Sequence, residues 1–143
     1  MTRLSLGESV ELIHLISGVN RQLEQLVEAR LKPTGIPIEQ YRVLSALNQH
    51  SGLPMGELAS TVFVDAPTLT KIVDRMVANA HVYRAPDPAD RRRVLIFMSE
   101  TGRKLFDEIH TILESTKTGL IDQFDRREAG HLRSLLENIL TRR

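Results

Sequence analysis

Basic side chains are concentrated in one stretch of the sequence, residues 66–93. The 143-residue chain carries 19 basic and 18 acidic residues, which leaves a net charge of only +1. The stretch holds three acids, Asp74, Asp87 and Asp90, against six basic residues, which are Lys71, Arg75, Arg84, Arg91, Arg92 and Arg93. Guanidinium and ammonium groups are well suited to bind phosphate oxygens. A basic stretch on a nearly neutral chain therefore predicts a polyanion bound at one place.

Other chemistry has little support in the sequence. Cysteine is absent, which excludes disulfides, thiol-based redox sensing and cysteine-bound metal. The five histidines, at positions 14, 50, 81, 110 and 131, lack the spacing of a metal site. The sequence also lacks a Ser/His/Asp arrangement and a glycine-rich phosphate loop. We therefore expect neither an enzyme nor a bound cofactor or metal.

Length and hydropathy favour one domain in the cytoplasm. A chain of 143 residues can bury one sizeable core. Its apolar runs are all much shorter than the ~20 residues that cross a bilayer. The N-terminal residues lack the apolar stretch of a secretion signal. We expect a cytoplasmic protein without membrane contact.

Two predicted helices, 55–61 and 66–80, position the first basic residues. Asp65 and Pro67 favour a helix start at residue 66, because the Asp carboxylate caps free amides and proline tolerates the first turn. One face of the longer helix is apolar, with Leu69, Ile72, Val73 and Met76. The opposite face carries Pro67, Lys71, Asp74, Arg75 and Ala78. This arrangement is typical of a helix-turn-helix.

An extended hairpin is predicted directly after these helices. Residues 82–84 and 93–98 are predicted strands, and the charged, turn-rich residues 86–92 connect them. A hairpin in this position is a wing. Strand alternation predicts that Val94, Ile96 and Met98 face inward. Leu95 and Phe97 are then expected to point outward, where a neighbouring subunit covers them or their exposure is tolerated.

Long helices are predicted on both sides of this lobe. Ser5 and Glu8 have capping-box spacing ahead of a first helix that runs to about Leu31, and a second helix follows at 38–49. Ser99 begins a long helix with periodic apolar positions as far as Thr116 and Leu120. After a break near 125–127, a final helix carries Leu132, Leu135, Leu136, Ile139 and Leu140. The terminal helices hold more apolar surface than a monomer can easily hide, which predicts a homodimer.

The expected fold is mainly α-helical with a small β-hairpin wing. It is a single domain over residues 1–143, in which residues 38–99 form a winged helix-turn-helix lobe. Residues 1–31 and 101–143 supply the N- and C-terminal dimerisation helices. Because a two-fold dimer presents two copies of the same surface, the expected DNA site is an inverted repeat.

Taken together, the pattern resembles the multiple-antibiotic-resistance regulator (MarR) family of bacterial transcription factors. Its most specific part is the wing signature, which stands here as Arg84, Asp87, Asp90-Arg91-Arg92, Val94, Ile96, Met98-Ser99 and Gly102. Supporting segments are residues 57–59 and 68–76. Ala80 departs from a common family glycine, so the left-handed closing residue is Asn79, Ala80 or a differently shaped turn. Pro37 and Pro54 stand where the family often has a capping Thr or Ser.

The longer helix is predicted to read the major groove of double-stranded DNA. Pro67 and Thr68 are candidates for contacts with thymine methyl groups. Thr70 is a candidate for a hydrogen bond to a base or phosphate, and Lys71 and Arg75 can reach guanine or the backbone. The alternative is a solvated polar helix face.

Arg92, at the tip of the wing, is the predicted minor-groove residue. The negative potential of a narrow A·T groove favours a weakly hydrated guanidinium. Asp90 is expected to hold the loop or the arginine stem, unless it only favours a turn. Arg91, Arg93 and Arg84 bind phosphate or pair within the chain, and the resemblance implies that Arg84 braces the wing.

The resemblance also implies a small effector, often aromatic and anionic, in a cleft between the dimer helices and the DNA-binding lobe. By position, the candidate lining residues are His14, Ser17, Arg21, Tyr41 and His110. Cationic or hydrogen-bonding groups beside apolar walls would suit a phenolic or benzoate-like acid. The alternatives are histidines that are packed or solvated and a Tyr41 that belongs to the core.

The expected function is therefore sequence-specific DNA binding that regulates transcription, as a repressor released from its operator by the effector. An activator or a ligand-independent DNA-binding protein of the same fold is the main alternative. A winged-helix module for protein–protein contacts is a further alternative, which the clustered wing arginines disfavour.

Overall fold

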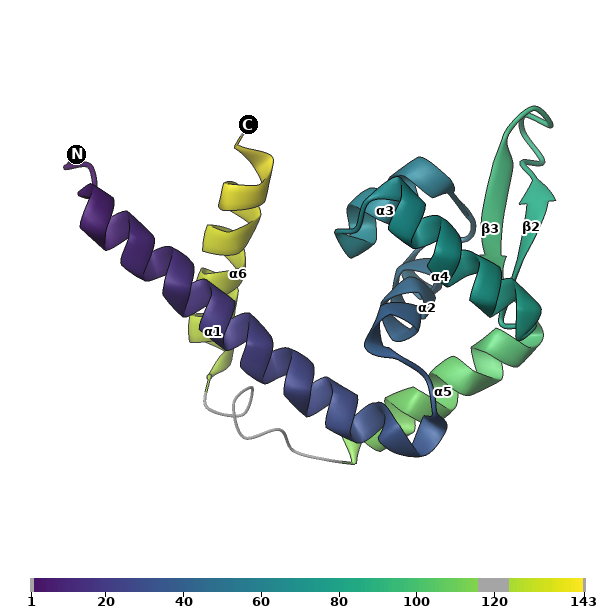
Figure 1. Cartoon of the computed structure of the whole chain (residues 1–143), viewed down its shortest axis with the longest axis horizontal. Helices are drawn as coiled ribbons and strands as arrows, with labels where there is room; N and C mark the ends of the chain where they lie inside the picture. Colours follow the sequence, from purple (N-terminus) through teal and green to yellow (C-terminus); the bar gives the residue numbers. More distant parts are fainter. Residues whose placement is uncertain (1, 116–123, 143) are drawn as a thin grey trace. The chain divides into compact units, whose positions relative to one another are not determined.

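The computed structural model describes residues 2–115 and 124–142 and divides the chain into two units, Met1–Leu113 and Glu114–Arg143. The elements in chain order are α1 (Leu6–Leu31), a 3₁₀ turn (Lys32–Thr34), α2 (Ile38–Gln49), β1 (Leu53–Pro54), α3 (Met55–Val62), α4 (Ala66–Ala78), β2 (Val82–Pro86), β3 (Val94–Met98), α5 (Glu100–Glu114) and α6 (Arg126–Thr141) (Figure 1). The predicted fold class, mainly helical with a small β wing, is confirmed.

Helix starts follow the local capping signals. Ser5 and Glu8 form the predicted capping box, with the Glu8 amide 3.1 Å from Ser5 Oγ and the Ser5 amide 2.7 Å from Glu8 Oε2. Helix α2 has the predicted bounds, and α3 extends one residue past its predicted end. Pro37 and Pro54 are the N-cap residues of these two helices and make no side-chain capping bond. Their φ values near −69° and −68° hold the extended conformation from which each helix begins.

Helix α4 ends at Ala78, two residues before the predicted end. The amides of Ala80 and His81 donate to the carbonyl oxygens of Val77 and Met76, at 3.0 and 2.9 Å. This pair of bonds is a Schellman motif, which requires a left-handed residue after the helix. Ala80 takes that conformation, with a φ of 62°. The turn therefore has the shape that usually accompanies glycine, with an alanine in a strained conformation.

The sheet has three strands rather than the predicted two, in the order β1–β3–β2. The short strand β1 pairs Leu53 with Ile96, and β2 pairs Pro86 with Val94. The inward prediction for Val94 is wrong, since its side chain is 51% exposed. The outward prediction for Leu95 is also wrong, since it is only 8% exposed.

Neighbouring strands explain both corrections. Leu95 lies between Pro54 of β1 and Ala85 of β2, so the unpredicted strand β1 adds a neighbour on its second side. Val94 pairs at the last position of the ladder, next to the hairpin loop. Phe97 is covered within the chain, because its ring stacks on Tyr83 at a centroid distance of 5.4 Å and a Cβ at Gly52 would lie 2.5 Å from it.

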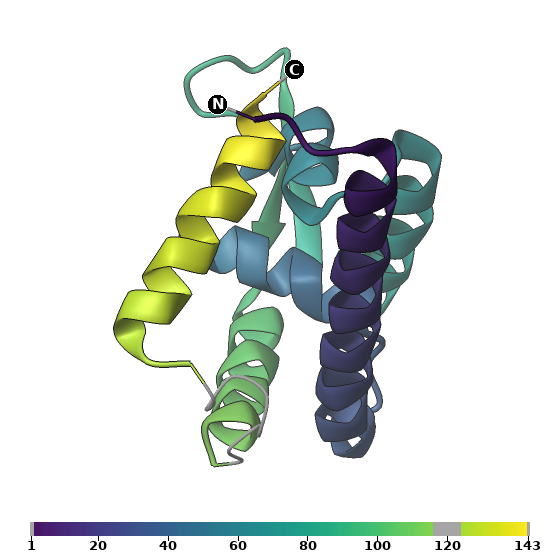
Figure 2. The same cartoon turned by 90° about the vertical axis from the view of Figure 1, so that its left-hand side faces the viewer.

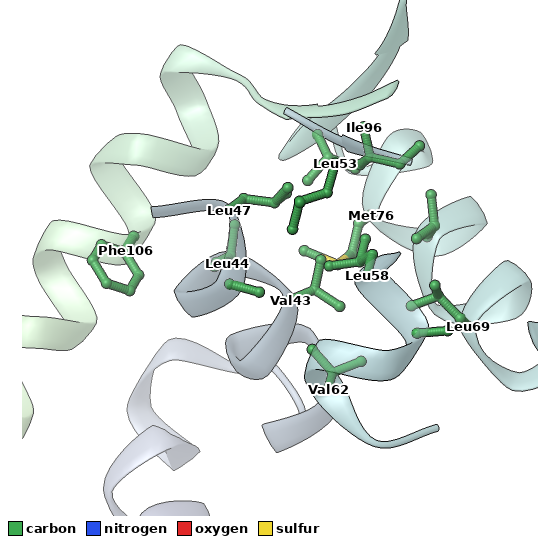
Figure 3. Close-up of a cluster of buried hydrophobic side chains, with 14 of the residues drawn as sticks. Val43, Leu44, Leu47, Leu53, Leu58, Val62, Leu69, Met76, Ile96 and Phe106 are labelled. Carbon is green, nitrogen blue, oxygen red and sulfur yellow. The ribbon is translucent and has the colours of Figure 1, made fainter. Parts of the chain in front are cut away.

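The core of the first unit joins α2, α3, α4 and β3 (Figure 3). Eight of its side chains have no exposed surface, namely Val43, Leu44, Leu58, Leu69, Val73, Met76, Ile96 and Ile109. Phe106 and Ile109 bring α5 into the same core. Full burial of one such side chain contributes about 1.5–3 kcal/mol, so this core fixes the orientation of α4 and of the hairpin base.

Helix α1 is attached to the lobe only near its C-terminal end. Leu31 is fully buried, and Arg42 of α2 forms an ion pair with Glu24 at 2.7 Å that holds the pKa of Glu24 below its usual 4.5. The N-terminal half of α1 extends away from the lobe (Figure 1). The hairpin loop also projects beyond the helices of this unit (Figures 1 and 2).

The second unit contains α6, which begins at Arg126 after the predicted break. Asp125 caps it in a second capping box with Glu128. The predicted apolar positions Thr116 and Leu120 lie outside the described residues. None of the described helices is both long enough and apolar enough to span a membrane.

Candidate nucleic-acid interface

Helix α4 presents a polar face opposite its buried face. Leu69, Val73 and Met76 are completely buried against the core. The side chains on the other face are all exposed; they include Pro67, Thr68, Thr70, Lys71 and Arg75. The core therefore fixes the helix so that every predicted major-groove residue faces solvent.

The N-terminus of α4 is capped by Asp65. Its Oδ1 accepts a 2.8 Å hydrogen bond from the Thr68 amide. Hydrogen bonds from Thr68, first from its side chain and then from its backbone, hold the pKa of Asp65 below its ordinary 3.8. The carboxylate is therefore ionised at neutral pH, where a negative charge stabilises a helix N-terminus.

Thr70 uses its hydroxyl proton within the helix. Its Oγ1 donates a 3.0 Å hydrogen bond to the Ala66 carbonyl. The remaining capacity of this oxygen is to accept, which suits a base amino group better than a phosphate.

The wing tip is closed by two aspartates. Asp87 Oδ1 accepts from the Ala89 amide at 2.9 Å, and the Asp87 amide donates to the Arg93 carbonyl at 2.9 Å. Asp90 Oδ1 accepts from both the backbone amide and the Nε of Arg92, at 3.1 and 3.3 Å. Arg92 itself is 92% exposed. Asp90 thus restricts the stem of Arg92 while its terminal nitrogens face solvent.

Two other arginines pair within the chain. Arg84 on β2 bonds to Asp74 on α4 at 2.5 Å, which ties the wing to that helix. Arg93 lies 3.8 Å from Glu57 on α3 and 3.9 Å from Asp87. Sequence reasoning did not identify Asp74 and Glu57 as partners of the wing arginines. Their only sequence signal is opposite charge, because the pairs join residues that are distant in the sequence.

The remaining cations are left without such partners. Within residues 2–115 and 124–142, Lys71, Arg75 and Arg91 form no ion pair. Together with Arg92 they give the surface around α4 and the wing tip an excess of positive charge. Such a surface attracts a polyanion.

The five predicted effector residues fall into two groups. Tyr41 is half-buried and stacks on Phe106 at a centroid distance of 6.3 Å, and the His110 ring lies 5.8 Å from Phe106. The Arg103 guanidinium, which bonds to Asn48 at 2.5 Å, lies 6.0 Å from the Phe106 ring. His14, Ser17 and Arg21 are exposed on α1, and no described contact links them to this cluster.

Sequence reasoning missed Phe106 and Arg103 in this cluster. In the sequence, Phe106 cannot be distinguished from other apolar residues at helical core positions. Arg103 likewise cannot be distinguished from other surface cations. Two surface pockets, one lined partly by Pro54 and the other partly by Pro37, include none of the five predicted effector residues in their walls. The described residues also contain no group of three or more His, Asp or Glu that could hold a metal ion.

Comparison with known proteins places this arrangement among transcription factors. The MarR family model matches residues 34–93, which run from the 3₁₀ turn before α2 to the hairpin loop before β3. The multiple antibiotic resistance protein MarR of Escherichia coli is 28% identical over 135 residues, or 94% of each chain. The HTH-type transcriptional regulator TtmR of Methylorubrum extorquens is 37% identical over 108 residues, which cover 73% of this chain and 51% of TtmR.

Solved structures agree over nearly the whole chain. A mutant of E. coli MarR complexed with operator DNA is 27% identical, with a TM-score of 0.80 over 96% of this chain and 99% of that one. CouR from Rhodococcus jostii, bound to p-coumaroyl-CoA, is 26% identical, with a TM-score of 0.85 over 97% and 98%. Members of this group are DNA-binding transcriptional regulators rather than enzymes. Over nearly its whole length, the chain is similar in sequence and in fold to winged helix-turn-helix transcriptional regulators of the MarR family.

Proposed function

We propose that this protein is a homodimeric repressor that binds an inverted-repeat operator and leaves it when a small aromatic acid binds. Residues 38–99 form its DNA-binding lobe within one domain, and residues 1–31 and 101–143 supply the dimerisation helices. The observation that carries the proposal is the exposed Arg92 at the wing tip, with its stem restricted by Asp90.

Helix α4 reads the major groove in this proposal. Its N-terminal turns present Pro67 and Thr68 to thymine methyl groups and Lys71 to guanine or phosphate. Thr70 accepts from a base, and Arg75 reaches guanine or the backbone. The buried face formed by Leu69 and Val73 supports this assignment, because it leaves all of these side chains exposed.

The wing reads the adjacent minor groove. Arg92 enters a narrow A·T groove, where a guanidinium meets a deepened negative potential. Asp90 positions Arg92, and Arg91 binds phosphate. Arg84 and Arg93 act mainly as braces, since each has an acidic partner in the chain.

The exposed apolar side chains support dimerisation. Helix α1 exposes Leu6, Val10, Leu12, Ile13, Leu15, Ile16 and Val19. Helix α6 exposes Leu132, Leu135, Leu136, Ile139 and Leu140. Apolar surface on this scale marks an interface.

We expect Ile13→Lys to convert a dimer into a monomer in light scattering, whereas Glu11→Lys, which changes a charge on the same helix, leaves the dimer intact. A monomeric wild-type protein would contradict the dimer.

The effector proposal rests on the aromatic cluster and on one relative. Tyr41 and His110 flank Phe106, with the Arg103 guanidinium nearby. Aromatic rings beside a cation and hydrogen-bonding groups suit a phenolic or aromatic carboxylate ligand. CouR, a structural neighbour of this chain, holds p-coumaroyl-CoA. His14, Ser17 and Arg21 of α1 would complete the site.

An activator of the same fold is the second candidate function. The transcriptional activatory protein BadR of Rhodopseudomonas palustris is 34% identical over 76 residues. The transcriptional repressor NicR of Pseudomonas putida is 38% identical over 68 residues. Transcription in vitro from the promoter beside the operator separates the two, because a repressor lowers transcript yield and an activator raises it.

Arg92→Ala is the main test. Binding is measured by fluorescence anisotropy on a duplex that the wild-type protein selects from random double-stranded DNA. Loss of a minor-groove arginine weakens binding by about tenfold or more, with the melting temperature nearly unchanged because Arg92 is exposed. Arg92→Lys keeps the charge, so its affinity for the duplex should lie between those of wild type and Arg92→Ala. Lys104 is an exposed cation on α5, and Lys104→Ala should bind the duplex as tightly as wild type. Equal binding by Arg92→Ala and wild type would refute the wing assignment.

A further inference from the structure

Phe63 stands out in the turn between α3 and α4. Its side chain is 73% exposed, the second most exposed large apolar side chain among the described residues. Its φ of 60° lies in the left-handed region. Ala80 is the only other non-glycine residue with a positive φ in residues 2–115 and 124–142. Both of these residues follow one of the two helices of the helix-turn-helix.

The left-handed conformation of Phe63 is imposed by the helix end. The amides of Phe63 and Val64 both donate to the Ala59 carbonyl, the latter at 3.1 Å, so the chain turns back over the end of α3. Glycine or asparagine tolerates this conformation, whereas a bulky residue here is an outlier. The strain is of the order of that found in sparsely populated backbone regions at functional sites.

Packing within the chain does not account for a phenylalanine at this position. The neighbouring Val62 is buried in the core and Val64 is half-buried, whereas the ring between them remains in solvent. An exposed ring gains little from the hydrophobic effect in the isolated chain. Its backbone therefore opposes the stability of the free protein, and its side chain adds little to that stability.

The position of Phe63 in the turn indicates its partner. It lies two residues before Asp65, which caps α4, and four before Pro67, the first predicted major-groove residue. Its exposed neighbours in the sequence are polar, namely Ser60, Thr61 and Asp65. The other large exposed apolar residues of the lobe, Tyr83 and Val94, lie on the hairpin. One isolated ring is too small for a protein interface, which buries about 800 Å² on each partner.

We propose that Phe63 is a DNA-contacting residue whose ring packs against the apolar edge of the DNA beside the N-terminus of α4. Thymine C5-methyl groups are the apolar groups that the major groove exposes, and deoxyribose is the apolar part of the backbone. This inference rests on the proposed function, because it places the ring beside the helix that reads the groove. It extends the contact surface from α4 into the preceding turn.

Phe63→Gly is the test, with Ala80→Gly as its matched control. Both substitutions relieve a left-handed non-glycine residue, so each should raise the melting temperature by about 2–4 °C. Only Phe63→Gly removes a ring. It should weaken binding to the selected duplex by about tenfold, whereas Ala80→Gly should bind like wild type. Phe63→Tyr, which keeps the ring, should retain most of the affinity.

The outcome separates this inference from the proposed function. If wild type selects a duplex and Phe63→Gly binds it equally well, Phe63 does not contact DNA although the protein does. If wild type selects no duplex, the proposed function itself fails. Replacing each operator thymine in turn by uracil removes only the methyl group. A loss at one thymine that is seen with wild type but not with Phe63→Gly identifies a methyl contact. If Phe63→Gly binds weakly and every uracil substitution affects both proteins equally, the ring contacts the sugar.

Discussion

Gly102→Ala should disrupt the junction between α4 and α5. Gly102 is the third residue of α5, and its amide donates to Ser99 Oγ at 2.9 Å. A Cβ at this position would overlap the His81 carbonyl oxygen and would lie 3.2 Å from Met98 Cγ. His81 directly follows the left-handed Ala80 that closes α4. Because the obstacle is backbone rather than a flexible side chain, α5 or the end of α4 must move.

The size of the effect follows from the bonds that this movement strains. The His81 carbonyl accepts from the Ser99 amide at 3.1 Å, and Ser99 Oγ donates to the Ala80 carbonyl at 2.5 Å. Overpacking costs about 1–3 kcal/mol, and each weakened hydrogen bond adds about 1 kcal/mol. Alanine is about 1 kcal/mol more favourable than glycine within a helix, which offsets part of this cost. The net destabilisation is about 2–4 kcal/mol, or a melting temperature lower by roughly 7–13 °C.

Thermal unfolding followed by circular dichroism measures this change. Wild type and variant are compared at one protomer concentration, because dimerisation couples stability to concentration. Gly56→Ala is the control, since a Cβ at that helical glycine of α3 would meet nothing within 4 Å. It should melt at or above the wild-type temperature. A Gly102→Ala protein that melts as high as the control would refute the close approach of α5 to His81.

Two further predictions concern charge. Lys71→Ala should reduce the slope of log affinity against log salt concentration by about 0.9 for each half-site. Arg84→Ala should change this slope less, because Asp74 already pairs with Arg84. Equal changes in slope for the two variants would contradict the bracing role of Arg84. The folded-state pKa of Asp65 lies below 3.8, so its ionised carboxylate stabilises the fold above that pH and this contribution is lost as the pH falls. Asp65→Asn keeps a neutral cap, so its melting temperature should fall less than that of wild type between about pH 5 and pH 3.

The helices are largely predictable because their signals are local. Capping residues such as Ser5 and Asp65 satisfy amides within three positions of themselves, so sequence spacing is enough to identify them. Periodicity likewise identifies the buried face of α4. The end of α4 is less predictable, because Ala80 gives no glycine signal for the left-handed turn that it forms.

The sheet is less predictable because its pairing is not local. Strand β1 is only two residues long and lies in a segment predicted as a break between helices. Its pairing with β3 depends on a partner more than 40 positions away. Without β1, the alternation of β3 gives Leu95 an exposed face and Val94 a buried one. Register and strand neighbours therefore decide burial where alternation alone cannot.

The charge pattern shows most clearly what the fold adds to the sequence. Six basic residues in one stretch predict only affinity for a polyanion. The fold commits Arg84 and Arg93 to acidic partners and leaves Lys71, Arg75 and Arg91 without one in the part of the chain that the structure describes. Asp90 binds the stem of Arg92 but leaves its terminal nitrogens exposed. The acids of this surface thus direct positive charge to one helix face and one hairpin tip, which is the arrangement that contact with two adjacent grooves requires.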